Sequence, residues 1–242
     1  MRYAVFGDIH ANLHALEAVL AAYRQESIDV YLCTGDLVGY GPYPRECIQR
    51  TREICKHVVA GNHDLAVCEK LNLEFFNTYA KSAVMWTRQQ LDPEQLEYLH
   101  RLPLSEVLDT DTTLSHATIY DPGAFDYIQT QYDAHLSLQE QRTTCGFVGH
   151  SHIPITFYLR DGVVSWTMES TIDLASCDKA LVNVGSVGQP RDENPDAAYA
   201  IFDTEKRKIW IKRVTYDVDA ASQAIAERGL PSILGERLRL GK

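Results

Sequence analysis

Four of the nine histidines in this chain stand in short blocks with Asp, Asn or Gly residues, and a fifth, His116, stands alone. Each block follows a short apolar run, so each is expected at the end of a strand. Carboxylate, amide and imidazole groups that meet at one edge of a sheet are the ligand types of a hydrolytic site with two metal ions. In chain order the blocks are Asp8-Ile9-His10, Gly35-Asp36, Gly61-Asn62-His63-Asp64, His116 and Gly149-His150-Ser151-His152.

The spacing within two of these blocks also favours metal binding. In an extended segment, residues i and i+2 point to the same side. Asp8 and His10 are therefore expected to reach one metal ion together, and so are His150 and His152. Two such pairs, each just after a predicted strand, are a more specific signal than any single histidine.

The elements that must position these residues begin as a repeated β-loop-α-β pattern. Strands are predicted over 2–7, 29–33 and 57–60, and helices from Leu13 to Tyr23 and over 45–56. This repeat predicts a parallel sheet with functional groups on the loops that follow its strands. A mostly helical pattern over 76–101 comes next, then strands over 112–115 and 145–148 that are separated by an irregular stretch, 117–142.

The last third of the chain changes character. Asp161-Gly162 separates two strand patterns, 155–160 and 163–168, as in a two-residue hairpin turn. Another strand is predicted over 181–184, a second hairpin over 199–203 and 208–216, and helices over 217–228 and 233–239. A parallel part followed by an antiparallel part predicts two packed sheets with helices outside, as a single α/β domain over residues 1–242.

Composition limits the class of protein and its partners. The chain has 242 residues, of which 45% are hydrophobic, so it can bury a large core. Its net charge of −10 argues against a nucleic-acid polymer as partner. Its six cysteines form no Cys-x-x-Cys pair, and no apolar run approaches the ~20 residues of a membrane span. The N-terminal apolar run is too short for a signal peptide, so we expect a cytoplasmic protein with no membrane partner; its oligomeric state is left open.

Together, the five blocks resemble those of the calcineurin-like metallophosphoesterase superfamily, most of all its small bacterial phosphodiesterase branch. The resemblance covers nearly the whole chain and includes the segments Gly7–Leu13, Gly35–Pro42 and Asn183–Asp192. It implies a four-layer α/β/β/α sandwich, in which two mixed sheets are flanked by helices.

The resemblance also implies roles for the individual residues. It assigns one metal ion to Asp8, His10 and His152, the other to Asn62, His116 and His150, and the bridging position to Asp36. A hydroxide between the ions would attack phosphorus. Mixed nitrogen and oxygen ligands favour Mn²⁺, or else Fe, Zn, Co or Ni, over Ca²⁺ and Mg²⁺. His63 is expected to be the catalytic acid or charge stabiliser, with Asp64 orienting its ring.

Three further residues, Asn12, Tyr40 and Arg191, are candidate substrate contacts, and each has a structural alternative. Asn12 also fits the N-cap of a helix. Tyr40, like Tyr43, fits a packing role, and Arg191 fits the stabilisation of a turn. Asp64 has an alternative too, because a carboxylate is favoured in the first turn of a helix.

One departure from the superfamily narrows the expected function. Gly39-Tyr40-Gly41 stands where its serine/threonine protein phosphatases carry Asp-Arg-Gly, which argues against a protein phosphatase. We expect a phosphodiesterase or pyrophosphohydrolase that acts on a small nucleotide-like or other phosphoester. The alternatives are a phosphomonoesterase that uses the same site and a non-catalytic scaffold that keeps the fold. The presence of His63 argues against the scaffold.

Overall fold

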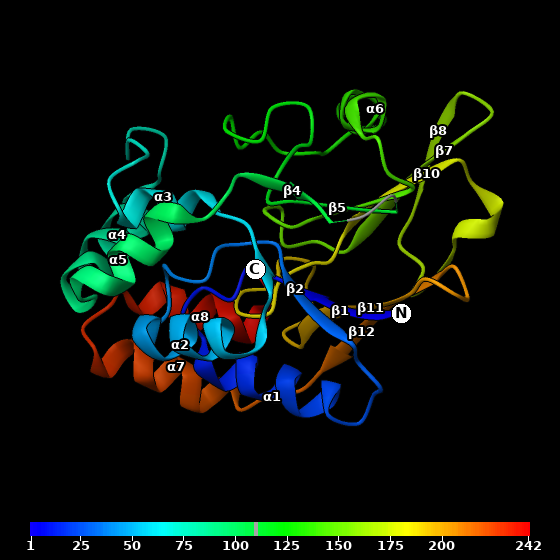
Figure 1. Ribbon diagram of the computed structural model, residues 1–242. Coiled ribbons are helices and arrows are strands. Elements are labelled where there is room, and N and C mark those ends of the chain that lie inside the picture. Colours follow the sequence, from blue (N-terminus) through cyan, green and yellow to red (C-terminus); the bar gives the residue numbers. More distant parts are fainter. Residues whose placement is uncertain (109–110) are drawn as a thin grey trace.

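In the computed structural model, which describes residues 1–108 and 111–242, the strands form two six-stranded mixed sheets (Figure 1). In spatial order, the first sheet contains β3 (His57–Val58), β2 (Val30–Cys33), β1 (Arg2–Phe6), β11 (Ala197–Asp203), β12 (Lys208–Val214) and β9 (Thr171–Asp173). The second contains β4 (Ser105–Val107), β5 (Thr112–Ser115), β6 (Cys145–Val148), β10 (Lys179–Asn183), β7 (Ile155–Arg160) and β8 (Val163–Thr167). Both are mixed, because β1 runs parallel to β2 and antiparallel to β11, and β10 runs parallel to β6 and antiparallel to β7.

Helices cover the outer faces of both sheets. The outer side of the first sheet carries α1 (Leu13–Tyr23), α2 (Pro44–Ile54), α7 (Val218–Glu227) and α8 (Ser232–Leu240) (Figure 1). The second sheet carries α6 (Gln131–Glu140). At one end of the sheets lie α3 (Asn62–Val67), α4 (Thr78–Gln90) and α5 (Pro93–Arg101), and a short 3₁₀ turn, Leu174–Ser176, follows β9. This is the predicted α/β/β/α sandwich.

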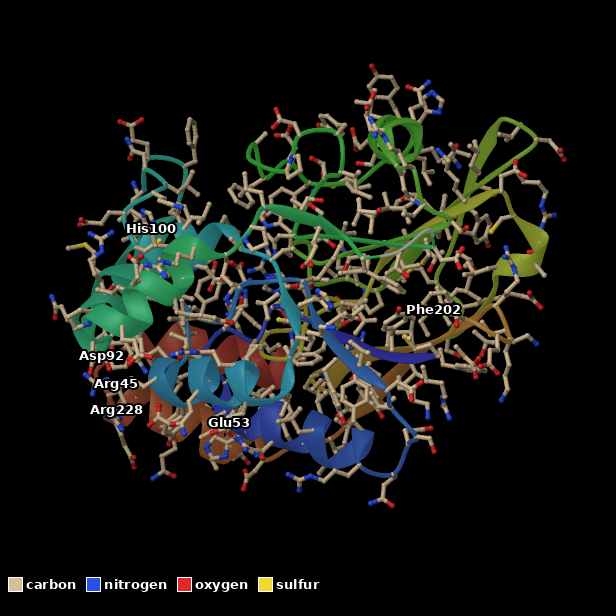
Figure 2. All side chains as sticks on the ribbon, viewed as in Figure 1. Arg45, Glu53, Asp92, His100, Phe202 and Arg228 are labelled. Carbon is tan, nitrogen blue, oxygen red and sulfur yellow. The ribbon has the colours of Figure 1, made fainter. Side chains whose placement is uncertain are left out.

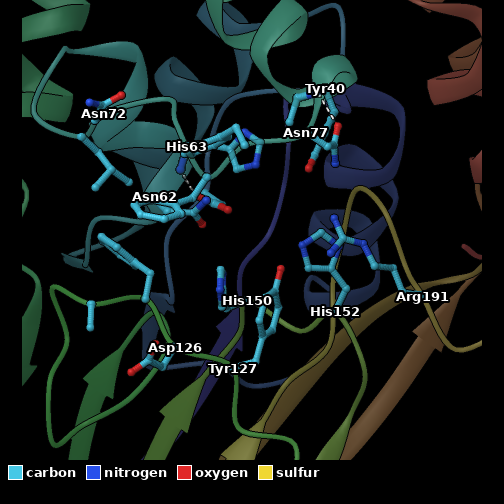
Figure 3. A pocket seen from close by; sticks show the side chains of 17 residues that line it. Tyr40, Asn62, His63, Asn72, Asn77, Asp126, Tyr127, His150, His152 and Arg191 are labelled. Atoms are coloured by element: carbon cyan, nitrogen blue, oxygen red, sulfur yellow. Dashed lines mark hydrogen bonds between the residues drawn. The ribbon is translucent and has the colours of Figure 1, made fainter.

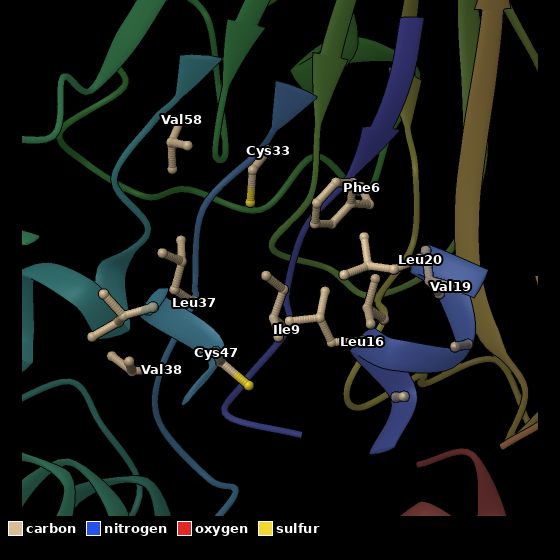
Figure 4. Close-up of a cluster of buried hydrophobic side chains, with 14 of the residues drawn as sticks. Phe6, Ile9, Leu16, Val19, Leu20, Cys33, Leu37, Val38, Cys47 and Val58 are labelled. Atoms are coloured by element: carbon tan, nitrogen blue, oxygen red, sulfur yellow. The ribbon is translucent and has the colours of Figure 1, made fainter. Parts of the chain in front are cut away.

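The alternation of side chains along β1 shows how the layers are held together. Ala4 and Phe6 face the helices, where Phe6 lies in one buried cluster with Leu16 and Leu20 of α1 (Figure 4). Tyr3 and Val5 face the second sheet. Because successive side chains of a strand point to opposite faces, one strand contributes to both cores.

The core between the two sheets is apolar and contains aromatic rings from both. Phe147 of β6 and Phe202 of β11 lie with their ring centroids 5.7 Å apart. Figure 2 shows Phe202 between the layers, whereas Arg45, Glu53 and Arg228 project from the outer helices into solvent. No helix within residues 1–108 and 111–242 is long and apolar enough to span a membrane.

Most of the predicted elements are confirmed to within a few residues, but the stretch 117–142 is not irregular throughout. It contains α6, which begins with a capping box in which Thr130 and Asp133 exchange hydrogen bonds. The helix buries only Ala134, Ser137 and Leu138, so its apolar stripe is weak in the sequence. Four short elements were also not predicted, namely α3, β4, β9 and the 3₁₀ turn Leu174–Ser176.

Candidate metal centre

The predicted blocks converge at one end of the two sheets. Asp8 and Asp36 follow β1 and β2, and Asn62 begins α3 just after β3. From the second sheet, His116 follows β5, and His150 and His152 follow β6. Three groups have ligand atoms within 4.8 Å of one another: Asp8, His10 and His152; Asp36, His116 and His150; and His10, Asp36 and His63. All of these side chains are buried.

Backbone carbonyls orient three of the histidine rings. The Nδ1–H groups of His10, His116 and His152 donate to the carbonyl oxygens of Val38, Thr34 and Gln189 at 3.1, 2.8 and 2.6 Å. A ring that donates through Nδ1 keeps a lone pair on Nε2 while it is neutral. Each Nε2 lies 3.2–3.9 Å from a carboxylate oxygen of Asp8 or Asp36. Such outer hydrogen bonds are typical of histidines that bind metal ions.

Four buried atoms of the predicted metal ligands have no hydrogen-bond partner among the described residues. They are Asp36 Oδ2, Asn62 Oδ1, His116 Nε2 and His150 Nε2. Buried polar atoms are nearly always paired in proteins, so four unpaired ones in one place require an explanation. Their nitrogen and oxygen lone pairs fit a divalent transition-metal ion.

The local backbone differs from the extended geometry expected from the sequence. Asp8, His10, Asp36, His150 and His152 have φ values of 48°, 49°, 51°, 66° and 62°, in the left-handed region. Non-glycine residues rarely adopt this conformation, and it concentrates at functional sites. The prediction that His150 and His152 share one metal ion because of their spacing is wrong in this geometry. His150 lies with Asp36 and His116, whereas His152 lies with Asp8 and His10.

Glycines allow the loops that carry these residues to pack tightly. A Cβ atom on Gly61 would lie 2.0 Å from Asp36 Oδ1, and one on Gly149 would lie 2.1 Å from Asp8 Oδ2. The carboxylate of Asp8 also accepts the backbone N–H of His150 at 3.1 Å, which joins a loop of the first sheet to a loop of the second. Gly61 and Gly149 therefore need to be glycines because of close approach.

The electrostatics of the protein groups alone favour neutral imidazoles with an ionised Asp36. Burial lowers the pKa values of His10, His150 and His152, which keeps their rings in the form that binds metal ions. Burial opposes ionisation of Asp36, but the neighbouring His116 and His63 hold its pKa well below the usual range. His116 is the exception, because its burial is outweighed by the charge of Asp36, whose Oδ2 lies 3.4 Å from Nε2 of His116, and its pKa is raised to about 9.

His63 lies at the site without being needed to complete either predicted ligand set. Its backbone N–H donates to Asp36 Oδ1 at 2.8 Å, and its ring contacts Tyr40 and Phe76 with centroids 4.5 and 5.1 Å away. Burial lowers its pKa to about 4. The ring therefore faces the cavity in its neutral form at pH 7.

Asp64 forms no hydrogen bond with the ring of His63, which corrects the prediction that it orients this histidine. Its Oδ1 accepts the backbone N–H groups of Leu37 and Val38 at 2.9 and 3.3 Å, and its Oδ2 accepts that of Gly61 at 3.0 Å. The Nδ1 atom of His63 has no hydrogen-bond partner among the described residues. Asp64 instead ties the start of α3 to the loop after β2, which is closer to its alternative as a residue of the first helical turn. Burial and the charge of Asp36 raise its pKa to about 7.

A cavity of about 430 Å³ opens above these residues (Figure 3). Its lining includes five of the predicted metal-binding and catalytic residues: Asp36, Asn62, His63, His150 and His152. Aromatic side chains of two loops, Phe75, Phe76, Phe125 and Tyr127, also line it. Tyr127 stacks on the ring of His150 with centroids 4.2 Å apart and an interplanar angle of 20°. These aromatic residues were not predicted as part of the site: Phe125 and Tyr127 fall in the stretch predicted to be irregular, and Phe76 falls in the segment predicted to be mostly helical.

The three candidate substrate contacts lie in different places. Tyr40 and Arg191 line the cavity, with the Tyr40 ring 4.7 Å from that of His10. Asn12 does not line it and caps α1 instead: its Oδ1 accepts the N–H of Ala15, and its amide donates to the Gly188 carbonyl. The structural alternative therefore accounts for Asn12. Tyr43 also lies outside the cavity lining and packs on His14.

Comparison with known proteins shows which protein family the chain belongs to. The sequence model of the calcineurin-like phosphoesterase family matches residues 1–177. An uncharacterized protein of Methanocaldococcus jannaschii is 39% identical over 242 residues, which cover 99% of this chain and 98% of that protein. The chain thus belongs to the calcineurin-like phosphoesterase family, whose members are hydrolases of phosphoesters that use divalent metal ions.

Solved structures resemble the chain over its full length. The crystal structure of a metallophosphoesterase from Sphaerobacter thermophilus has 37% identity and a TM-score of 0.86, and the match covers 100% of this chain and 99% of that one. A hypothetical protein from Pyrococcus horikoshii has 22% identity and a TM-score of 0.80, over 100% of this chain and 98% of that one. The Pyrococcus horikoshii protein therefore shares the fold of this chain.

Proposed function

We propose that this protein is a dinuclear-metal phosphodiesterase or pyrophosphohydrolase that acts on a small nucleotide-like phosphoester. The observation that carries the proposal is the set of four unpaired, buried ligand atoms beside the group of Asp8, His10 and His152. Two divalent ions would give all of these atoms a partner. The atoms lie where a substrate can reach them, because Asp36, Asn62 and His150 line the cavity.

The residues present fit two ions of the proposed kind. Asp8, His10 and His152 would hold one, Asn62, His116 and His150 the other, and Asp36 would contribute to both. The mixture of imidazole, carboxylate and amide ligands favours Mn²⁺, with Fe, Zn, Co and Ni as the alternatives. When bound, two such ions supply activation of water and positive charge toward a phosphoester.

The protein contributes a fixed ligand geometry and a proton donor. Hydrogen bonds to Val38, Thr34 and Gln189 hold the rings of His10, His116 and His152, so these ligands need no rearrangement to bind. We assign proton donation to His63, whose ring faces the cavity. Its pKa is lowered by burial, and an anionic phosphate beside it raises that pKa again. Substrate binding thus favours the protonated ring, which donates to the leaving-group oxygen.

The size and surroundings of the cavity support a small substrate. A volume of about 430 Å³ lies within the range of pockets for small molecules. Tyr40 and Arg191 are the proposed substrate contacts at its wall. The net charge of −10 disfavours a nucleic-acid polymer as substrate, and the six free thiols agree with a cytoplasmic protein.

Steady-state rates on a matched pair of chromogenic substrates test the proposal. With Mn²⁺ supplied, we expect faster hydrolysis of bis(p-nitrophenyl) phosphate than of p-nitrophenyl phosphate. The reverse preference would favour the phosphomonoesterase. Fewer than two ions per chain at saturating Mn²⁺, together with no turnover of either compound, would favour the non-catalytic scaffold.

A further inference from the structure

Arg191 lines the cavity, and Arg237 lies on the helix that packs against Tyr40 of the cavity wall; both arginines come from the part of the chain beyond residue 177, where the family match ends. Arg191 is in the loop between β10 and β11, and Arg237 is in the last helix, α8. Neither forms an ion pair with an acidic residue within residues 1–108 and 111–242. Other arginines nearby do, since Arg213 pairs with Asp192, and Arg239 pairs with Asp219 at 2.8 Å.

Arg191 is held against the metal centre by its own loop. Its backbone N–H donates to the carbonyl of His152 at 3.3 Å, and its Nη2 donates to Gln189 Oε1 at 2.9 Å. Its guanidinium lies 5.9 Å from the centroid of the Tyr40 ring and lines the cavity next to His152 (Figure 3). Its Nε atom is buried and has no hydrogen-bond partner among the described residues.

Arg237 is not among the residues that line the cavity, but its helix packs against Tyr40, which does line it. Leu234 and Leu238, three residues before Arg237 and one residue after it in α8, pack in one buried cluster with Tyr40. The end of α8 is fixed to the loop of Arg191, because Glu193 donates its backbone N–H to the Gly241 carbonyl at 2.9 Å. Arg237 itself donates through Nε to the Lys242 carbonyl at 2.7 Å, which leaves its two Nη groups without a partner in the described structure.

Arg237 is within electrostatic reach of Arg191 and of two tyrosines. Half-burial and the charge of Arg191 lower the pKa of Arg237, while Tyr40 and Tyr127, which both line the cavity, oppose this effect. Two cations brought together without a carboxylate are unfavourable unless an anion binds between them. Guanidinium groups suit phosphate oxygens, because their N–H donors form paired hydrogen bonds with them.

We propose that Arg191 and Arg237 form a second anion site, which binds a phosphate next to the one that is hydrolysed. This inference rests on the proposed function and narrows its substrate class to phosphoanhydrides, such as nucleoside polyphosphates, rather than simple diesters. The arginines would hold the phosphate that is not attacked and so set the position of the anhydride bond over the metal centre.

Calorimetric titration with two non-hydrolysable probes, methylenediphosphonate and methylphosphonate, tests the proposal on protein saturated with Mn²⁺. We expect the wild-type protein to prefer the diphosphonate. Arg237→Gln should weaken diphosphonate binding roughly ten- to a hundredfold more than it weakens methylphosphonate binding. Arg237→Lys keeps the positive charge but not the paired N–H donors. Its affinity for the diphosphonate should lie between those of the wild type and Arg237→Gln, and it gives a second comparison if the Gln variant does not fold.

Arg239→Gln is the matched control, because Arg239 lies on the same helix but bonds to Asp219 and Ser222. It should leave both affinities unchanged. Equal weakening of both probes by Arg237→Gln, or no weakening of either, would overturn the second anion site. The titration requires no turnover, so its result is separate from the hydrolysis test of the proposed function.

Discussion

At the scale of single residues, the site depends on what each ligand candidate does with its other polar atom. The Nδ1–H groups of His10, His116 and His152 donate to backbone carbonyls, so their Nε2 atoms point to the proposed metal centre. The Oδ1 atom of Asp36 accepts the backbone N–H of His63, and its Oδ2 atom has no hydrogen-bond partner among the described residues. Asp36 therefore couples the ligand sets to the proposed proton donor through one side chain.

Asp36→Asn should remove bound metal and activity together. The amide keeps the size of the carboxylate but loses its charge and one of its two ligand oxygens. We expect fewer than two Mn²⁺ ions per chain by elemental analysis and a fall in turnover of ~100-fold or more. Asp203→Asn is the control, since Asp203 is also largely buried but lies at the opposite end of the first sheet. Retention of two ions by Asp36→Asn would contradict the proposed shared ligand.

His63→Ala should separate metal binding from catalysis. Because its ring completes neither proposed ligand set, the variant should bind the same amount of metal as the wild type. Its turnover should fall by roughly 10²–10⁴-fold, as for the loss of a general acid. His14→Ala, which removes a histidine that packs on Tyr43, should keep wild-type rates. A His63→Ala protein that hydrolysed bis(p-nitrophenyl) phosphate at the wild-type rate would exclude the assignment.

At the scale of elements, the sequence was informative about strands and much less about the loops that follow them. Apolar runs before Asp8, Asp36 and His116 located the strand ends, because buried strands have a simple pattern. The left-handed backbone at His150 and His152 has no such pattern, since tertiary hydrogen bonds such as that from His150 N–H to Asp8 impose it. The partners of Asp64 were missed for the same reason, because all three are backbone groups.

Asp64→Ala should lower the stability of the fold, because Asp64 holds two loops together. It leaves the N–H groups of Leu37, Val38 and Gly61 without their acceptor. Unpaired buried donors cost about 1–3 kcal/mol each, so we expect the free energy of unfolding to fall by about 3 kcal/mol. Urea unfolding of the metal-free protein measures this without a contribution from bound metal. Unchanged stability of the variant would show that the carboxylate is not a structural acceptor.

Glu26, which lies between α1 and β2, should make the free energy of unfolding depend on pH. Its carboxylate accepts from Lys212 of β12 and from Arg2 of β1, and these two contacts lower its pKa. A lowered folded-state pKa adds stability above the unfolded value of about 4.3, and this stability is lost as the pH falls through the folded value. Glu26→Gln should cost about 1 kcal/mol at pH 7 and progressively less in acid.

Chemical unfolding of wild type and Glu26→Gln at pH 7 and pH 3 checks this prediction. Glu205→Gln serves as the control, because Glu205 pairs with the N-terminus at the exposed surface. A difference between wild type and Glu26→Gln that stayed the same at both pH values would argue against the ion pairs.

At the scale of the whole molecule, the metal centre joins the two sheets. The first sheet supplies Asp8, His10, Asp36 and Asn62, and the second supplies His116, His150 and His152. Each predicted ligand set takes residues from both sheets, as His152 lies with Asp8, and His116 with Asp36. Metal ions bound there would act as cross-links between the sheets at one end of their shared core.

Removal of metal should therefore lower the thermal stability of the entire fold. A ligand that binds only the folded state at about 100 times its Kd stabilises that state by about 2.7 kcal/mol, so saturating Mn²⁺ should raise Tm by about 5–10 °C over the chelated protein. Asp36→Asn should lose most of this rise, whereas His63→Ala should keep it, because only the first removes a proposed ligand. Scanning calorimetry with and without Mn²⁺ distinguishes the two variants. If both responded to Mn²⁺ like the wild type, the ions would be bound elsewhere, and the end of the sheets would not be the metal centre.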